Sequence, residues 1–137
     1  MLLHGKNFCA ATWDGTIKAL SGAGYRVIAP DQIGFCKSGK PAMYQFSFAQ
    51  LAANTRALLQ SLGIDSSVVL GHSMGGRIGQ WLAIDAPERV RRLVLASTTG
   101  GDRRDGPRGP GIDAALASGD RRTMTPLFFT DGFAAQH

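Results

Sequence analysis

The amino-acid sequence predicts an α/β fold in which a mostly parallel sheet carries helices on both faces. Short apolar runs alternate along the chain with segments whose apolar residues recur at helical spacing, and this alternation is typical of parallel strand–helix–strand units. In addition, residues 71–75 read Gly-His-Ser-Met-Gly and lie between an apolar run and a helical pattern. A serine flanked by glycines at such a junction indicates a sharp turn that exposes a nucleophile.

Four short apolar runs predict the strands of this sheet. They lie at residues 2–3, 25–29, 67–70 and 92–96, and Pro30 stops the second of them. Strands of a parallel sheet with helices on both faces are buried on both sides, so they read as continuous apolar runs.

Three segments with helical periodicity connect these runs. The first, over 13–20, carries Trp, Ile and Leu at i, i+4 and i+7, which gives it an apolar stripe. The second, over 48–62, has one apolar face and is closed by Gly63. The third follows Ser73 and ends before Pro87.

The serine at position 73 requires support from its surroundings. A serine hydroxyl is a weak nucleophile at neutral pH, so it needs a nearby base and donors for the developing oxyanion. The Met74 N–H lies in the first turn of the predicted helix, where the helix dipole also favours negative charge. A strand that ends in His4-Gly5 can supply a second donor, the backbone N–H of Lys6.

Three motifs resemble, in order and spacing, those of the α/β-hydrolase superfamily, in its serine esterase, lactonase and C–C hydrolase branch. They are His-Gly at 4–5, Ala-Pro-Asp-Gln-Ile-Gly-Phe-Cys-Lys-Ser at 29–38 and Gly-His-Ser-Met-Gly-Gly at 71–76. The resemblance implies a partial α/β-hydrolase fold in which Ser73 is the nucleophile and the oxyanion donors are the two amides named above. The second motif departs from the family at Cys36, where many relatives carry glycine.

The general base is the part of the site that this chain lacks in its usual place. The resemblance places the triad acid and histidine on strands after the lid, so it implies a chain truncated at both ends. His72 is expected to point away from Ser73, which leaves His137 and His4 as possible bases. His4 is also expected to hold the oxyanion loop, and Asp31 is expected to shape its own loop.

A change in composition near residue 98 predicts two parts of the chain. Residues 1–97 form the truncated hydrolase core, and residues 98–137 form a polar, glycine-rich linker followed by short helices that resemble the start of a helical lid. Phe8, Phe35 and Phe128 are candidates for an apolar substrate pocket. Ordinary core or lid packing is the alternative role for each of these side chains.

Composition and charge exclude several classes of function. The net charge is +5, but the basic residues are dispersed and lack interleaved aromatic residues, which argues against nucleic-acid binding. No apolar stretch approaches the roughly 20 residues of a membrane span. Cys9 and Cys36 form neither a metal-binding set nor a disulfide framework, so we expect no metal, no cofactor and a reduced, cytoplasmic protein.

Two hypotheses of function follow. The first is a serine hydrolase that acts on a small acyl ester and is weak because the usual triad acid and histidine are absent. The second is a non-catalytic, self-associating α/β module. It rests on the runs at 25–29 and 92–96, which the family order leaves as bare sheet edges that invite pairing with a second copy.

Overall fold

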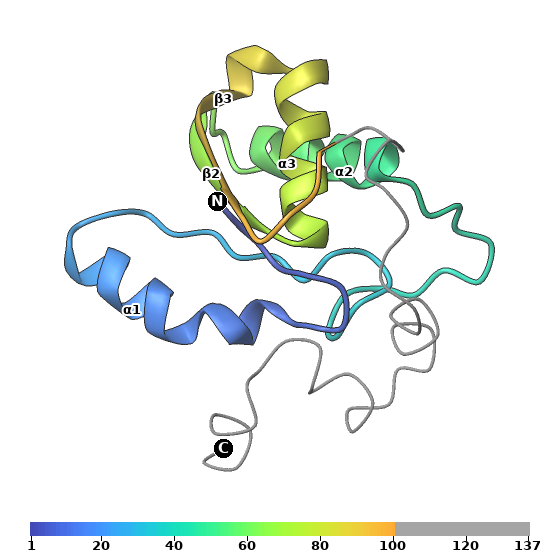
Figure 1. The fold of residues 1–137 in the computed structure, drawn as a ribbon, viewed down its shortest axis with the longest axis horizontal. Helices are drawn as coiled ribbons and strands as arrows, with labels where there is room; N and C mark the ends of the chain where they lie inside the picture. The colour runs from blue at the N-terminus through green and yellow to red at the C-terminus, as the bar shows by residue number, and fades with distance from the viewer. Residues whose placement is uncertain (101–137) are drawn as a thin grey trace, which may run out of the picture. The chain divides into compact units, whose positions relative to one another are not determined.

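A computed structural model describes residues 1–100, which belong to a compact unit that extends over Met1–Gly101 (Figure 1). The described elements are short strands, α-helices and 3₁₀-helices, and they alternate along the chain. In order they are β1 (Leu2–Leu3), η1 (Ala10–Trp13), α1 (Asp14–Gly22), α2 (Phe48–Ser61), β2 (Ser67–His72), α3 (Met74–Asp85), η2 (Pro87–Arg89) and β3 (Val90–Ala96). The predicted linker and lid lie outside the described residues, apart from positions 98–100.

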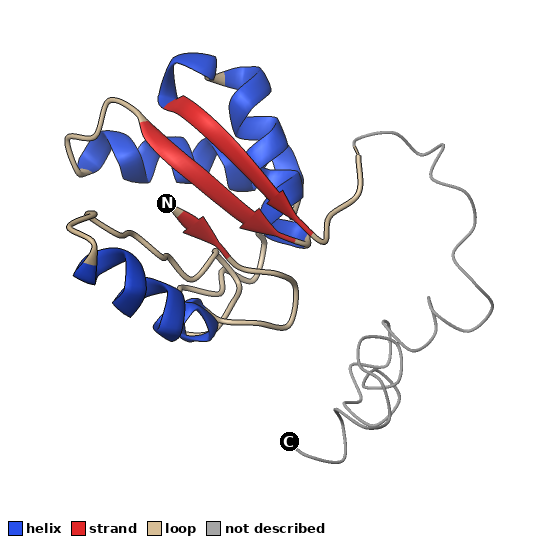
Figure 2. Cartoon of the chain, turned by 60° about the vertical axis from the view of Figure 1, so that its left-hand side comes forward, coloured by secondary structure: helices blue, strands red, loops and turns tan. Residues whose placement is uncertain are grey.

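The three strands form one parallel sheet in the order β1-β2-β3 (Figure 2). Leu70 of β2 is the register partner of Leu2 on one side and of Val94 on the other. The runs predicted at 67–70 and 92–96 lie inside β2 and β3, so the sequence located both strands. The parallel α/β class predicted from the alternating pattern is confirmed for the described residues.

The predicted strand at 25–29 was wrong. The Ile28 carbonyl accepts a hydrogen bond from the Leu2 N–H at 2.8 Å, but no ladder continues from this contact within residues 1–100. The reason is that β1 is only two residues long and offers few partner groups. In addition, Pro30 has no N–H to donate.

Helices α2 and α3 cover one face of the sheet, and Figure 2 shows both behind the strands. A Cβ atom added at Gly79 of α3 would meet Leu93 and Val69, which places the helix directly against β3 and β2. Fully buried Leu59 and Ile78 carry the apolar faces of α2 and α3 into the same core. The core therefore lies between this helix pair and the sheet.

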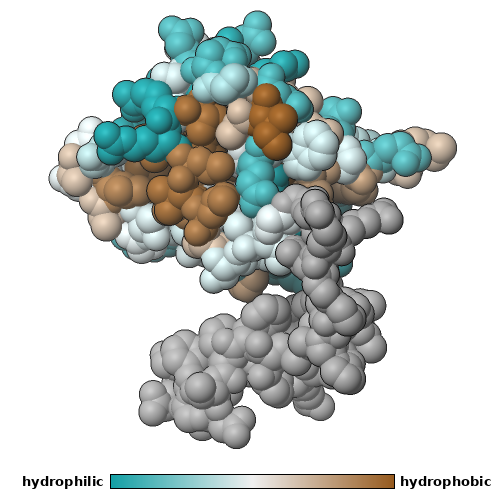
Figure 3. Space-filling model, turned by 45° about the horizontal axis from the view of Figure 1, so that its top comes forward, coloured by the Kyte–Doolittle hydropathy of each residue, from teal (hydrophilic) through white to brown (hydrophobic). Residues whose placement is uncertain are grey.

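The opposite face of the sheet is open in the described part of the chain. Side chains alternate along a strand, so Val68 and Val94 point away from α3. They are 40% and 46% exposed. Figure 3 shows apolar residues gathered on one face of the molecule. Helices α2 and α3 therefore cover one face of β2 and β3, and the other face of these two strands carries half-exposed valines.

Helix α1 forms where the apolar stripe predicted it, but the helix has no buried residue. Trp13, Ile17 and Leu20 are each only half-buried. None of the helices among the described residues is both long and apolar enough to cross a lipid bilayer.

Candidate active site

Ser73 occupies a sharp turn between the end of β2 and the start of α3. Its backbone angles are φ 52° and ψ −114°, a conformation that residues with a side chain rarely adopt. Two glycines permit the turn. A Cβ atom at Gly71 would overlap the backbone of Gly75, and one at Gly75 would overlap the Leu3 carbonyl. The motif thus packs the first turn of α3 directly onto β1 and β2.

The loop that follows β1 lies beside this turn. A Cβ atom at Gly5 would be 3.3 Å from Ser73 Cβ and 3.0 Å from His72 Nδ1. The loop then turns back through a hydrogen bond from the Phe8 N–H to the Gly5 carbonyl (3.2 Å), with Lys6 and Asn7 in the middle of the turn. The structure thus brings the two segments that carry the predicted oxyanion amides next to the serine.

Neither predicted oxyanion donor has a hydrogen-bond partner in the described part of the chain. Within residues 1–100, no hydrogen bond uses the backbone N–H of Lys6 or of Met74. Lys6 is exposed and Met74 begins α3, so a helix N-terminus adds its favourable field for negative charge. As far as residues 1–100 are concerned, both amides are available to a bound group.

The segment after β3 fixes the turn from its other side. Thr98 Oγ1 donates a hydrogen bond to the Ser73 carbonyl at 2.7 Å, and the Ser73 N–H donates to the Ala96 carbonyl at 3.0 Å. Sequence analysis did not single out Thr98. A signal was present, because a Cβ atom at Gly76 would overlap the Thr98 side chain, and a glycine in a helix interior often marks such a close approach.

The imidazole of His4, one of the two possible bases, is buried and already hydrogen-bonded. Its Nε2 accepts from the Gln32 N–H at 2.9 Å, and its Nδ1 lies 2.9 Å from the Gly5 carbonyl oxygen. These partners fit a neutral ring with its proton on Nδ1, which leaves no acceptor nitrogen for the Ser73 hydroxyl. The arrangement supports the predicted role in holding the oxyanion loop and argues against His4 as the base.

The remaining predicted site residues divide between the described and the undescribed parts. Phe8 is 43% exposed and packs edge-on against the His72 ring, at 5.8 Å between centroids. The Phe35 ring packs edge-on against the His4 ring, at 5.4 Å between centroids. This side chain therefore supports the loop that follows β1. Phe128 and His137 lie outside the described residues.

Asp31 organises the loop that follows it. Its carboxylate accepts hydrogen bonds from the Ala10 N–H (2.7 Å) and the Lys37 N–H (3.0 Å), and its carbonyl accepts from Ser38 Oγ (2.6 Å). The Ala10 amide is the main cause that holds the pKa of this carboxyl below its ordinary value, and the Lys37 amide adds to it. The predicted loop-shaping role agrees with these contacts.

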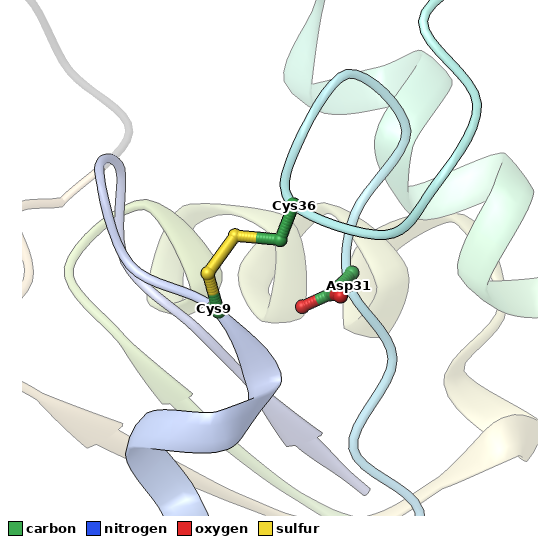
Figure 4. A group of neighbouring side chains, drawn as sticks. All are labelled: Cys9, Asp31 and Cys36. Carbon is green, nitrogen blue, oxygen red and sulfur yellow. A yellow bond between two sulfur atoms is a disulfide. The ribbon is translucent and has the colours of Figure 1, made fainter.

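Cys9 and Cys36 form a disulfide, with their Cα atoms 5.8 Å apart (Figure 4). The expectation of two separate reduced cysteines was wrong, because 27 positions of chain separation hid their proximity. Their sulfur atoms and a carboxylate oxygen of Asp31 lie within 4.8 Å of one another, an arrangement that reduced cysteines could offer to a metal ion. As a disulfide, the sulfurs are not thiolate ligands.

The chain belongs to the α/β-hydrolase fold family, whose model matches residues 1–129. It is similar to the 2-hydroxymuconate semialdehyde hydrolase of Pseudomonas putida, with 45% identity over 75 residues. These residues are 55% of this chain and 27% of that protein.

Two solved structures show the same relationship. A probable hydrolytic enzyme from Pseudomonas aeruginosa PAO1 is 61% identical and has a TM-score of 0.70, over 72% of this chain and 32% of that one. A meta-cleavage product hydrolase from Pseudomonas fluorescens IP01 is 34% identical, with a TM-score of 0.69, over 72% and 37% of the two chains. The matched segment is therefore about a third of these relatives' length.

Proposed function

We propose that this chain carries the nucleophile half of a serine hydrolase that acts on carboxylic esters. One observation carries the proposal: Ser73 sits in a left-handed, glycine-enclosed turn, and the flanking loop lies so close that a Cβ atom at Gly5 would be 3.3 Å from Ser73 Cβ. A strained backbone at a polar side chain indicates function more strongly than a serine in an ordinary turn would. The hydrolase relatives support the reaction class.

The proposed chemistry begins with attack of Ser73 Oγ on the acyl carbonyl carbon. The carbonyl oxygen becomes an oxyanion, and the Lys6 and Met74 amides would donate hydrogen bonds to it. The attacking hydroxyl gives its proton to a base, and the alkoxide leaving group takes up a proton as the acyl-enzyme forms. Water then hydrolyses the acyl-enzyme. The exposed ring of Phe8 is available to contact the apolar part of such an ester.

The proposed reaction also needs a general base to accept the proton of Ser73. With His4 committed to its loop, the proton acceptor is His137 or a group supplied from outside this chain. In a characterised serine protease, removal of the serine or histidine costs on the order of 10⁶ in turnover. We therefore expect slow turnover by the chain alone, and reaction of Ser73 with activated reagents.

The test compares wild type with Ser73→Ala on p-nitrophenyl acetate and butyrate, together with labelling by a fluorophosphonate. The matched control is Ser61→Ala, because Ser61 is an exposed serine at the end of α2, away from the elbow. We expect Ser73→Ala to lose hydrolysis and labelling while Ser61→Ala keeps both. Equal rates for all three proteins would reject the hydrolase proposal.

A second candidate function is a non-catalytic module that associates with its own copies. The half-exposed Val94 and Leu95 on the edge strand β3 favour this alternative, since an unpaired apolar edge invites pairing. Val94→Lys is expected to lower the molar mass measured by light scattering. Met43→Lys, which changes a 91% exposed loop residue, is the matched control. A wild-type monomer at high concentration would exclude this candidate.

We also propose a small acyl ester as the substrate class and a cytoplasmic location. The disulfide opposes the second of these, because disulfides persist mainly in oxidising compartments. Rapid alkylation of cells before lysis tests the location. A protein in the reducing cytoplasm would yield two modified thiols, and a protein in an oxidising compartment would yield none.

A further inference from the structure

The Cys9–Cys36 disulfide joins the loop that borders Ser73 to the 31–38 loop. Cys9 ends the turn that carries the Lys6 amide and immediately precedes η1, and Cys36 lies in the 31–38 loop. Figure 4 shows the bond bridging these loops next to Asp31. The Cys36 sulfur also lies 3.7 Å from the carbonyl oxygen of Phe8. The crosslink therefore lies three residues along the chain from Lys6.

The oxyanion turn is held at both ends, and its middle is exposed. Lys6, Asn7 and Phe8 are exposed, whereas His4 and Gly5 before them are buried. The inner end is held by β1 and by the His4–Gln32 hydrogen bond. The outer end is held by the Ala10–Asp31 hydrogen bond and the disulfide. Exposed turns with few apolar contacts open readily, so loss of a covalent restraint there is expected to have a local effect.

Position 36 indicates that the crosslink is a distinct feature of this loop. The backbone of Cys36 has φ 44°, in the left-handed region that favours glycine. Position 36 thus carries a cysteine, which forms the crosslink, although its backbone conformation is unfavourable for any residue with a side chain. The half-buried Cys9 and the exposed Cys36 also leave the bond open to attack from solvent.

We propose that the Cys9–Cys36 disulfide is a reducible crosslink that holds the Lys6 amide in place beside Ser73, so that thiol–disulfide exchange controls the reactivity of the serine. This inference rests on the proposed hydrolase function. The co-reactant is a dithiol. Its thiolate attacks the Cys36 sulfur and breaks the bond to Cys9, which leaves as a thiolate and takes up a proton. The second thiol then releases Cys36, so two protein thiols and one oxidised dithiol result.

Three measurements on the full chain test the proposal. Thiol titration after unfolding counts free cysteines, amide hydrogen exchange follows residues 5–10, and the rate of fluorophosphonate labelling follows Ser73. On reduction we expect two new thiols, at least tenfold faster exchange in the turn and roughly tenfold slower labelling. The melting temperature should fall by on the order of 10 °C, because a long closed loop is released in the unfolded chain.

The double variant Cys9→Ser/Cys36→Ser is the matched control. It is expected to behave as the reduced protein does and to be insensitive to the dithiol. A second variant, Cys9→Ser/Cys36→Gly, removes the crosslink and suits the left-handed backbone at position 36, so it keeps the test decisive if the first variant does not fold.

The outcomes separate this inference from the proposed function. Two free thiols in protein kept under oxidised glutathione would show that the crosslink does not form. Equal rates of amide hydrogen exchange in the turn in both redox states would show that the crosslink does not hold the turn. Equal labelling rates in both states, with the exchange difference present, would overturn its control of Ser73. If Ser73 is labelled in neither state and Ser73→Ala loses no ester hydrolysis, the hydrolase function is rejected, and with it any control of that function.

Discussion

The Nε2 atom of His4 accepts a hydrogen bond from the backbone N–H of Gln32 at 2.9 Å. This contact connects the 31–38 loop with the turn after β1, which lies next to the elbow serine. His4 is 1% exposed and Gln32 is 4% exposed, so water cannot readily replace the bond. The imidazole is therefore part of the framework that positions the oxyanion turn.

We predict that His4→Ala lowers the free energy of unfolding by about 2–4 kcal/mol, because it leaves a cavity and an unpaired buried amide. His4→Gln keeps a side-chain acceptor and is expected to lose less. Urea unfolding followed by circular dichroism measures both values. If His4→Ala unfolded at the wild-type urea concentration, a framework role for this ring would be untenable.

Gly75→Ala is predicted to destabilise the fold by roughly 3 kcal/mol or more, because the added methyl group overlaps the Leu3 carbonyl in a fully buried strand. Gly15→Ala is the matched control: it makes the same chemical change in α1, where a Cβ meets nothing within 4 Å. There, alanine is expected to add about 0.5–1 kcal/mol of stability. If both substitutions moved the denaturation midpoint in the same direction, close packing of Gly75 against β1 would be contradicted.

The carboxylate of Asp31 makes stability depend on acid pH. Its pKa is lower in the folded state than in the unfolded chain, so its contribution is present above the unfolded value of about 4. The contribution is lost as pH falls through the folded value. We predict a declining melting temperature below about pH 5 that Asp31→Asn flattens. The control Asp14→Asn makes the same chemical change at an exposed carboxylate in α1.

Local patterns predicted most of the described fold, because periodicity and breakers act over short distances. Ser47 caps α2 by accepting from the Gln50 N–H, and Gly63 follows it with a positive φ, which explains why this helix had clear limits in the sequence. The strand predicted at 25–29 failed because ladder formation depends on the neighbour available. The two residues of β1 offer too few backbone groups to pair with residues 25–29. The sequence of residues 25–29 contains no information about the length of that neighbour.

The candidate site was predictable only where its geometry is encoded by consecutive residues. The glycines around Ser73 and the His-Gly pair predicted the turn and its neighbouring loop. By contrast, the Thr98–Ser73 hydrogen bond and the Cys9–Cys36 disulfide join segments separated by 25 and 27 positions. Such pairs form only after the sheet and loops assemble, so no short motif identifies both partners; Gly76 indicated only that some group packs closely against α3.

The backbone of Ser73 gives a prediction that is independent of catalysis. At φ 52° and ψ −114°, any Cβ atom is strained, and such conformations cost on the order of 1–3 kcal/mol. Glycine relieves this strain but loses about 0.4–1 kcal/mol through greater freedom of the unfolded chain. Ser73→Gly is therefore predicted to be more stable than Ser73→Ala by about 1 kcal/mol, measured by urea unfolding.

The matched control for this comparison is the same pair of substitutions at Ser61, the last residue of α2. In ordinary helical backbone, glycine is less favourable than alanine by up to about 1 kcal/mol, so the order of stability should reverse there. If alanine were the more stable residue at both positions, Ser73 would occupy a relaxed turn. The elbow geometry would then no longer distinguish this serine from the others in the chain.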